Sequence, residues 1–119
     1  MDSPTRTLLL FRAVFWGMCL GIFVLAMLPN NTSPIAFPNA DKIAHAMAFA
    51  GLSFVGCLAY PLRIFVLATF LVFLGAAIEV AQGFRPDRSQ ELFDFLADVV
   101  GIALGFITYR LSERGFLRK

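Results

Sequence analysis

Four long apolar segments constrain this chain more than any other feature of its sequence. They cover about residues 8–28, 43–60, 64–81 and 92–109. Each is close to the roughly 20 helical residues needed to cross a hydrocarbon core of roughly 30 Å. Backbone polar groups must be paired within lipid and no alternating barrel pattern appears, so we expect helices rather than strands. The sequence therefore predicts an all-α integral membrane protein, with four transmembrane helices in a single domain over residues 1–119.

The composition agrees with this prediction and excludes several classes of protein. Hydrophobic residues make up 59% of the chain and charged residues only 15%, which a soluble domain of this size does not tolerate. A net charge of +2 with no basic patch argues against a nucleic-acid partner. Cys19 and Cys57 lie inside apolar segments without metal-ligand spacing, so we interpret both as packing residues. We expect no metal centre and no cofactor.

The lysines and arginines predict how the spans are oriented. Short connections make successive spans antiparallel, so the N-terminus, the turn at 61–63 and the C-terminus share one side. That side carries Arg6, Arg12, Arg63, Arg110, Arg114, Arg118 and Lys119, whereas the other carries only Lys42, Arg85 and Arg88. The positive-inside rule therefore predicts an antiparallel bundle with both termini in the cytoplasm. The first segment lacks small cleavage-site residues before Pro29, so we interpret it as a span rather than a signal peptide.

Polar residues gather near the predicted outer ends of the last three spans. A carboxylate at the centre of a bilayer costs roughly 2.5 to 3.5 kcal/mol, so such residues usually pair with one another or mark a function. Residues three or four positions apart share a helix face, which directs these side chains toward the bundle interior. The predicted polar cluster consists of Asp41, Lys42, His45, Glu79, Gln82, Arg88, Asp94 and Asp98.

Glycines spaced along the same faces predict close helix contacts. Small residues let helices approach closely in lipid, where packing rather than the hydrophobic effect holds helices together. The predicted packing residues are Gly17, Gly21, Gly75, Gly101 and Gly105. The same glycine faces are compatible with contact between two copies of the chain, so a homo-oligomer is an open alternative.

Three motifs that carry the polar cluster resemble the VanZ-like membrane protein family. In order they are DKIAH (41–45), EVAQ (79–82) and RSQELFDFLADVVGIALG (88–105), so the resemblance covers about residues 41–105. Asp98 stands where many relatives have asparagine. The family is named for a protein that lowers susceptibility to the glycopeptide teicoplanin. The resemblance therefore implies an envelope-associated role in the bacterial cytoplasmic (inner) membrane, and an effect on glycopeptide susceptibility.

Several functions remain open from the sequence. The leading hypothesis is an outward-facing polar pocket that binds an envelope-associated amphiphile or anion, with Arg88 available for the anion. The amphiphile could be a lipid headgroup, a cell-wall precursor or a lipidated glycopeptide. A second hypothesis is a membrane-embedded acid/base enzyme acting on such a headgroup, with His45, Glu79 and Asp94 as candidate catalytic residues. An ion-coupled carrier is less favoured, and a structural four-helix scaffold held by an ion-pair network is a further alternative. The sequence favours binding over catalysis without deciding between them.

Overall fold

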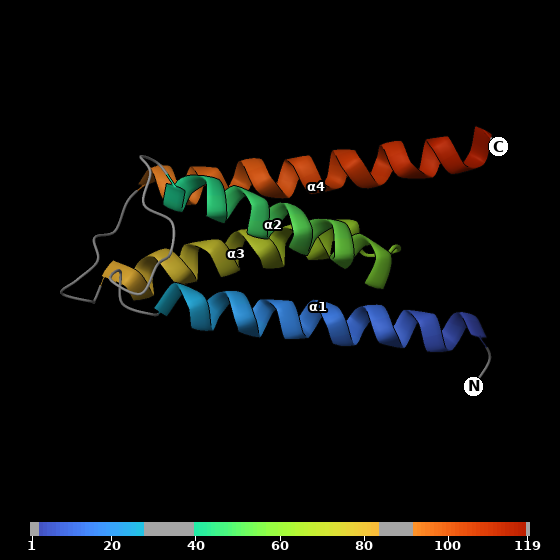
Figure 1. Ribbon diagram of the computed structural model, residues 1–119, viewed down its shortest axis with the longest axis horizontal. Coiled ribbons are helices and arrows are strands. Elements are labelled where there is room, and N and C mark those ends of the chain that lie inside the picture. The colour runs from blue at the N-terminus through green and yellow to red at the C-terminus, as the bar shows by residue number, and fades with distance from the viewer. Residues whose placement is uncertain (1–2, 28–39, 84–91, 119) are drawn as a thin grey trace.

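Four helices account for nearly all of the residues that the structure describes. The computed structural model describes residues 3–27, 40–83 and 92–118, and side chains at 5–27, 42–81, 83 and 95–113. Helix α1 runs from Ser3 to Met27, α2 from Ala40 to Ala59, α3 from Ile64 to Gly83 and α4 from Leu92 to Arg118 (Figure 1). No strand occurs in these ranges. The all-α prediction is confirmed, and α4 continues beyond the span end predicted at Tyr109.

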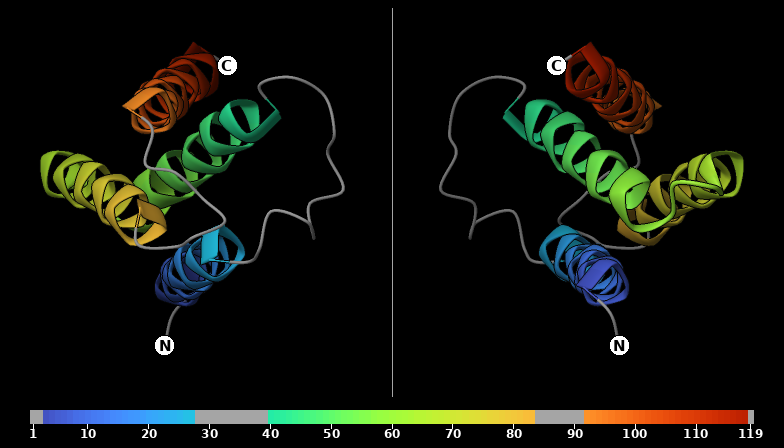
Figure 2. Two further views of the ribbon diagram at one scale, coloured as in Figure 1. Left: turned by 90° about the vertical axis from the view of Figure 1, so that its left-hand side faces the viewer. Right: turned by 90° about the vertical axis from the view of Figure 1, so that its right-hand side faces the viewer.

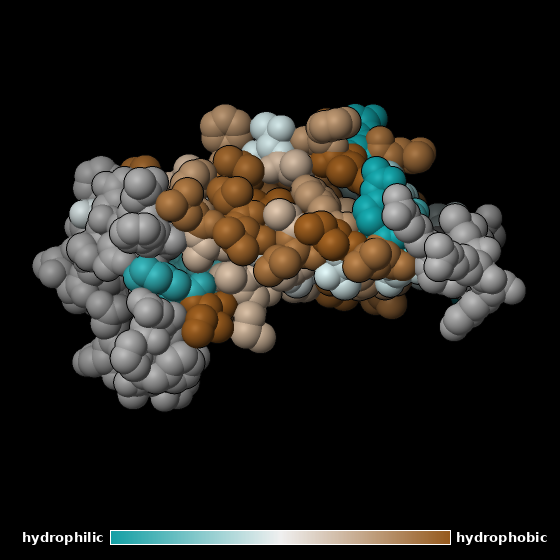
Figure 3. All heavy atoms as spheres, turned by 90° about the horizontal axis from the view of Figure 1, so that it is seen from above, coloured by the Kyte–Doolittle hydropathy of each residue, from teal (hydrophilic) through white to brown (hydrophobic). Residues whose placement is uncertain are grey.

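All four helices are long and apolar enough to cross a membrane. The spanning stretches are Thr5–Met27, Lys42–Ala59, Ile64–Ala81 and Phe95–Glu113. Large apolar side chains also point outward along them, with Phe65 89% exposed and Met47 70% exposed. Apolar residues cover the middle of the face shown in Figure 3, and polar residues appear toward its two ends. Such an apolar surface is far larger than a water-soluble monomer exposes, which supports a multi-pass membrane protein.

Helix α2 is the centre of the bundle. It contacts α1, α3 and α4, and its contact with α4 is the most extensive in the chain (Figure 2). The core between the helices contains Phe15 of α1, Phe49 and Leu52 of α2, and Leu71 and Ile78 of α3, each at most 1% exposed. The start of α2, the end of α3 and the start of α4 lie at one end of the bundle, on the left of Figure 1. This end contains His45, Glu79 and Asp98, and we call it the triad end.

A short turn joins α2 to α3 at the opposite end, where Pro61 predicts one. The Tyr60 N–H still donates to the Gly56 carbonyl at 2.8 Å, and the Arg63 N–H donates to the Tyr60 carbonyl at 3.1 Å. The Leu67 N–H then donates to the Arg63 carbonyl at 2.9 Å, which begins α3. The turn therefore satisfies the backbone groups at both helix ends, as a position near a membrane requires.

Side chains from α1 hold this turn in place. Arg12 Nε donates to the Ala59 carbonyl at 3.0 Å, and its guanidinium lies 4.6 Å from the centre of the Tyr60 ring. Trp16 Nε1 donates to the Tyr60 hydroxyl at 2.9 Å. One arginine thus satisfies a carbonyl at the end of α2 and stacks on an aromatic ring, a geometry that lysine would not reproduce.

We expect Tyr60→Phe to lower the stability of the protein by about 0.6 kcal/mol, the average for a side-chain hydrogen bond in a membrane bundle. The substitution removes the acceptor of the Trp16 N–H and keeps the ring under Arg12. Thermal unfolding in dodecylmaltoside gives the stability, and fluorescence of Trp16, the single tryptophan, reports the lost bond as a blue shift. Tyr109→Phe is the matched control, because Tyr109 bonds Glu113 instead and should leave Trp16 emission unchanged.

Candidate functional site

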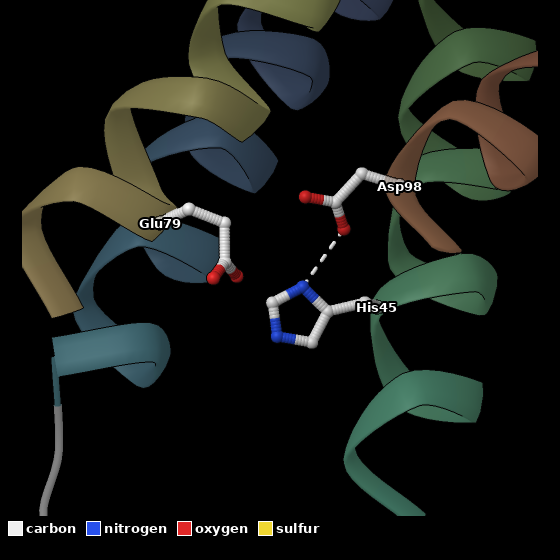
Figure 4. Close-up of side chains that lie close together, drawn as sticks. All are labelled: His45, Glu79 and Asp98. Carbon is white, nitrogen blue, oxygen red and sulfur yellow. Dashed lines mark hydrogen bonds and ion pairs between the residues drawn. The ribbon is translucent and has the colours of Figure 1, made fainter. Parts of the chain in front are cut away.

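Three of the predicted polar residues meet inside the triad end of the bundle. His45 comes from the second turn of α2, Glu79 from near the end of α3 and Asp98 from the second turn of α4. We call these three residues the buried triad. Each offers one ligand-type atom, and the three atoms lie within 4.8 Å of one another. The His45 ring lies beside both carboxylates (Figure 4).

The buried triad is shielded from its surroundings. Glu79 is 3% exposed and Asp98 is 1% exposed, while the His45 side chain is 14% exposed. His45 Nδ1 and Asp98 Oδ1 lie 2.8 Å apart and form a hydrogen bond. Because an ionised carboxylate only accepts, the bond to an ionised Asp98 places a proton on Nδ1, and Nε2 is then an acceptor when the imidazole is neutral. Two carboxylates and one imidazole therefore share a small volume of low polarity.

The glycines of α4 set the register that brings His45 to Asp98. A Cβ at Gly101 would run into the backbone of Ala46, the residue after His45. A Cβ at Gly105, one turn further along α4, would run into the Ala50 carbonyl and Ser53 Oγ. Close backbone approach at these two points brings α2 and α4 together near the turn that carries Asp98. The predicted packing role of Gly101 and Gly105 thus also positions the candidate site.

Gly75 makes room for Asp98 on the other side. A Cβ at Gly75 would lie 2.9 Å from Asp98 Oδ2, so the carboxylate rests directly against α3. Oδ2 is fully buried and has no hydrogen-bond partner within the described part of the chain. A buried carboxylate oxygen in this situation is costly and calls for an explanation by a ligand or a function.

The remaining predicted site residues lie mostly outside what the structure describes. Lys42 is half-buried in the first turn of α2 and has an interaction partner. Arg88 is not in the described ranges, and the side chains of Asp41, Gln82 and Asp94 are not among the described side chains. Their membership of the polar cluster stays a prediction.

Gly17 and Gly21 differ from the packing prediction. A Cβ at either position would meet nothing within 4 Å among the described residues, and both residues are exposed on α1. No described helix packs on them, because this face of α1 turns away from the bundle. The same Gly-x-x-x-Gly spacing therefore makes a helix contact on α4 and none within the chain on α1.

Comparison with known proteins adds no relative to this geometry. No family model, no curated protein and no solved structure matches the chain. The arrangement of the buried triad therefore has to be interpreted from its own chemistry.

That chemistry favours cations and hydrogen-bond donors. The side chains of the buried triad supply two carboxylates and one imidazole, which accept hydrogen bonds and coordinate cations. The Asp98–His45 bond also orients the imidazole, as a carboxylate does for a histidine that acts as a base. An anion would need a positive group in addition.

A second feature lies at the opposite end of the bundle and was not predicted from the sequence. A cavity of about 550 Å³ lies among α1, the turn at 60–63 and the start of α3. Arg12, Trp16, Tyr60, Arg63 and Phe70 are among its lining residues. The sequence signal for this cavity was Arg12, a charged residue inside an otherwise apolar span. Counting lysines and arginines to predict orientation uses Arg12 only as a charge.

Proposed function

We propose that this chain is a VanZ-like protein of the bacterial cytoplasmic membrane that binds the headgroup of an envelope amphiphile at the buried triad. A lipid headgroup, a cell-wall precursor or a lipidated glycopeptide would supply that headgroup. One observation carries the proposal. Polar residues on three different helices converge at one end of an apolar bundle, within three residues of the ends of the spanning stretches. His45, Glu79 and Asp98 come one from each of the three motifs on which the family resemblance rests.

The proposal includes an antiparallel bundle with both termini in the cytoplasm. The excess of lysine and arginine at the two termini and the 61–63 turn supports that orientation. In this orientation the triad end faces the outer leaflet, where cell-wall precursors and glycopeptides are encountered. An effect on teicoplanin susceptibility follows if the headgroup bound is that of the drug or of its target.

We expect purified protein in dodecylmaltoside to bind the hydroxyl or amine groups of a headgroup probe, and Glu79→Gln to weaken that binding about tenfold or more, as loss of one charged hydrogen-bond partner would. Phosphatidylglycerol, undecaprenyl phosphate and teicoplanin are the three probes, measured by native mass spectrometry and by microscale thermophoresis. Arg63→Gln at the opposite end of the bundle is the matched control and should bind as the parent does. If no probe binds to folded protein, the structural scaffold becomes the better account.

One observation favours an enzyme as the second candidate. The 2.8 Å bond from His45 to Asp98 orients the imidazole, and Glu79 lies beside it. In that reading His45 acts as the general base on a headgroup hydroxyl or on water, with Glu79 as the second proton carrier. Turnover of envelope lipids by the purified protein, abolished in Glu79→Gln and in His45→Gln, would identify it. Headgroup binding without any turnover would favour the binding protein over the enzyme.

A further inference from the structure

The buried triad has the composition of a metal-binding site. One imidazole and two carboxylates offer three ligand atoms within 4.8 Å of one another, from three separate helices. The carboxylates are both at least nine-tenths buried, so bulk water does not satisfy them. Three protein ligands with further positions left for water or substrate are typical of functional rather than structural metal sites.

We propose that His45, Glu79 and Asp98 bind a divalent cation of the Zn²⁺ or Mn²⁺ type. The mixed ligand set selects this class, because imidazole suits zinc and its neighbours whereas Mg²⁺ and Ca²⁺ prefer oxygen alone. Binding of the metal ion depends only on these three residues and is independent of the proposed function. The identity of the molecule that binds next to the ion rests on the proposed function.

One of the distances already fits a shared cation, and the third ligand needs a small shift. Nitrogen and oxygen ligands lie about 2.1 Å from such ions, so two neighbouring ligands of one ion lie about 3 Å apart. His45 Nδ1 and Asp98 Oδ1 are 2.8 Å apart. The cation would take the place of the proton between these atoms, and that proton would be released to solvent. Small shifts of the flexible Glu79 side chain would complete the third bond.

Asp98 supplies the second, independent observation. Its Oδ2 is buried against Gly75 and has no hydrogen-bond partner in the described ranges. Figure 4 shows this oxygen directed toward α3, the helix that carries Glu79. A carboxylate that bonds His45 with one oxygen and leaves the other buried is poorly satisfied by protein alone. A cation bound to Asp98 would offset the negative charge that the two oxygens of this carboxylate share.

Charge balance supports the same conclusion. Two ionised carboxylates and a neutral imidazole carry two negative charges, which a divalent cation cancels. A neutral assembly is less costly within a membrane than one that carries two negative charges. The cation also explains how an acidic site would accept an anionic headgroup, because phosphate oxygens would bond the metal ion rather than meet two carboxylates.

Metal binding is tested directly on the full chain in dodecylmaltoside. The protein carries Cys19→Ala and Cys57→Ala, which removes competing thiols, and is stripped with EDTA before titration with ZnCl₂ or MnCl₂. Mass spectrometry of bound metal after desalting and calorimetric titration give the stoichiometry and the affinity. We expect about one ion per chain, with binding that weakens as the pH falls because protons compete for the ligands.

Glu79→Gln keeps the size of the side chain and removes its charge. We expect it to weaken metal binding by roughly 100-fold or more, since even the partners of metal ligands contribute about 10- to 100-fold. Glu113→Gln, near the far end of α4, is the matched control and should bind as the parent does. As a readout in the parent protein that depends on no variant, bound Co²⁺ should give visible absorption bands that disappear when ZnCl₂ displaces the cobalt. Equal binding by Glu79→Gln, or less than about a tenth of an ion per chain in the parent, would overturn the proposal.

The metal titration contains no headgroup, so the two proposals fail separately. Metal binding without binding of phosphatidylglycerol, undecaprenyl phosphate or teicoplanin would uphold the cation site and refute the proposed function. Headgroup binding that survives EDTA, with no metal bound, would uphold the proposed function and refute the cation site.

Discussion

His45→Leu is expected to lower the free energy of unfolding by about 3 kcal/mol in metal-free protein. The reason is that the substitution leaves the Asp98 carboxylate buried, at 1% exposure, without the imidazole that lies 2.8 Å from it. Breaking a buried pair by removing one partner is costly because the other partner stays desolvated. Reversible unfolding by SDS in dodecylmaltoside micelles, followed by Trp16 fluorescence, gives the free energy.

The second half of this experiment separates the pair from general packing. Adding Asp98→Ala to His45→Leu removes the stranded carboxylate and should restore about 1 to 2 kcal/mol, because the buried charge at position 98 is gone. Thr108→Val is the control for a polar change on α4, since the Thr108 hydroxyl only bonds the Leu104 carbonyl of its own helix. If the double variant is less stable than His45→Leu, the unpaired Asp98 carboxylate does not destabilise the fold, and this explanation is wrong.

Gly101→Ala is expected to destabilise the protein by about 2 kcal/mol, although it adds a single methyl group. The three atoms nearest to the added Cβ all belong to the backbone of Ala46, so no rotamer change relieves the contact and α2 must move away from α4. The movement begins next to His45 and therefore also lengthens the bond to Asp98. The same SDS titration measures the loss of stability.

Gly17→Ala is the matched control for this substitution. The added Cβ would meet nothing within 4 Å, so the change should be neutral or stabilise α1 by up to about 1 kcal/mol through helix propensity. Equal effects at Gly17 and Gly101 would contradict the close α2–α4 contact. The comparison isolates packing, because the two substitutions are chemically identical.

The sequence was sufficient to predict the helices and their approximate ends. Lipid imposes a length of about 20 apolar residues and a fully paired backbone, and both conditions can be recognised along the chain. Local signals such as Pro61 also located the turn between α2 and α3. The clustering of polar residues near the ends of three spans followed from the same pattern, and three of them do meet.

Which polar residues meet, and which glycines pack, depended on the rotation of each helix about its axis. Asp94 and Asp98 share a helix face, and the structure brings Asp98 to His45. Gly17 and Gly21 have the same spacing as Gly101 and Gly105, but only the α4 pair contacts α2. Every apolar helix here is nearly uniform around its circumference, so hydropathy alone does not select the face that turns inward. Packing between whole helices makes that choice, and so the sequence determined a four-helix membrane bundle with polar residues at one end, while the tertiary structure alone assembled His45, Glu79 and Asp98 into one buried site.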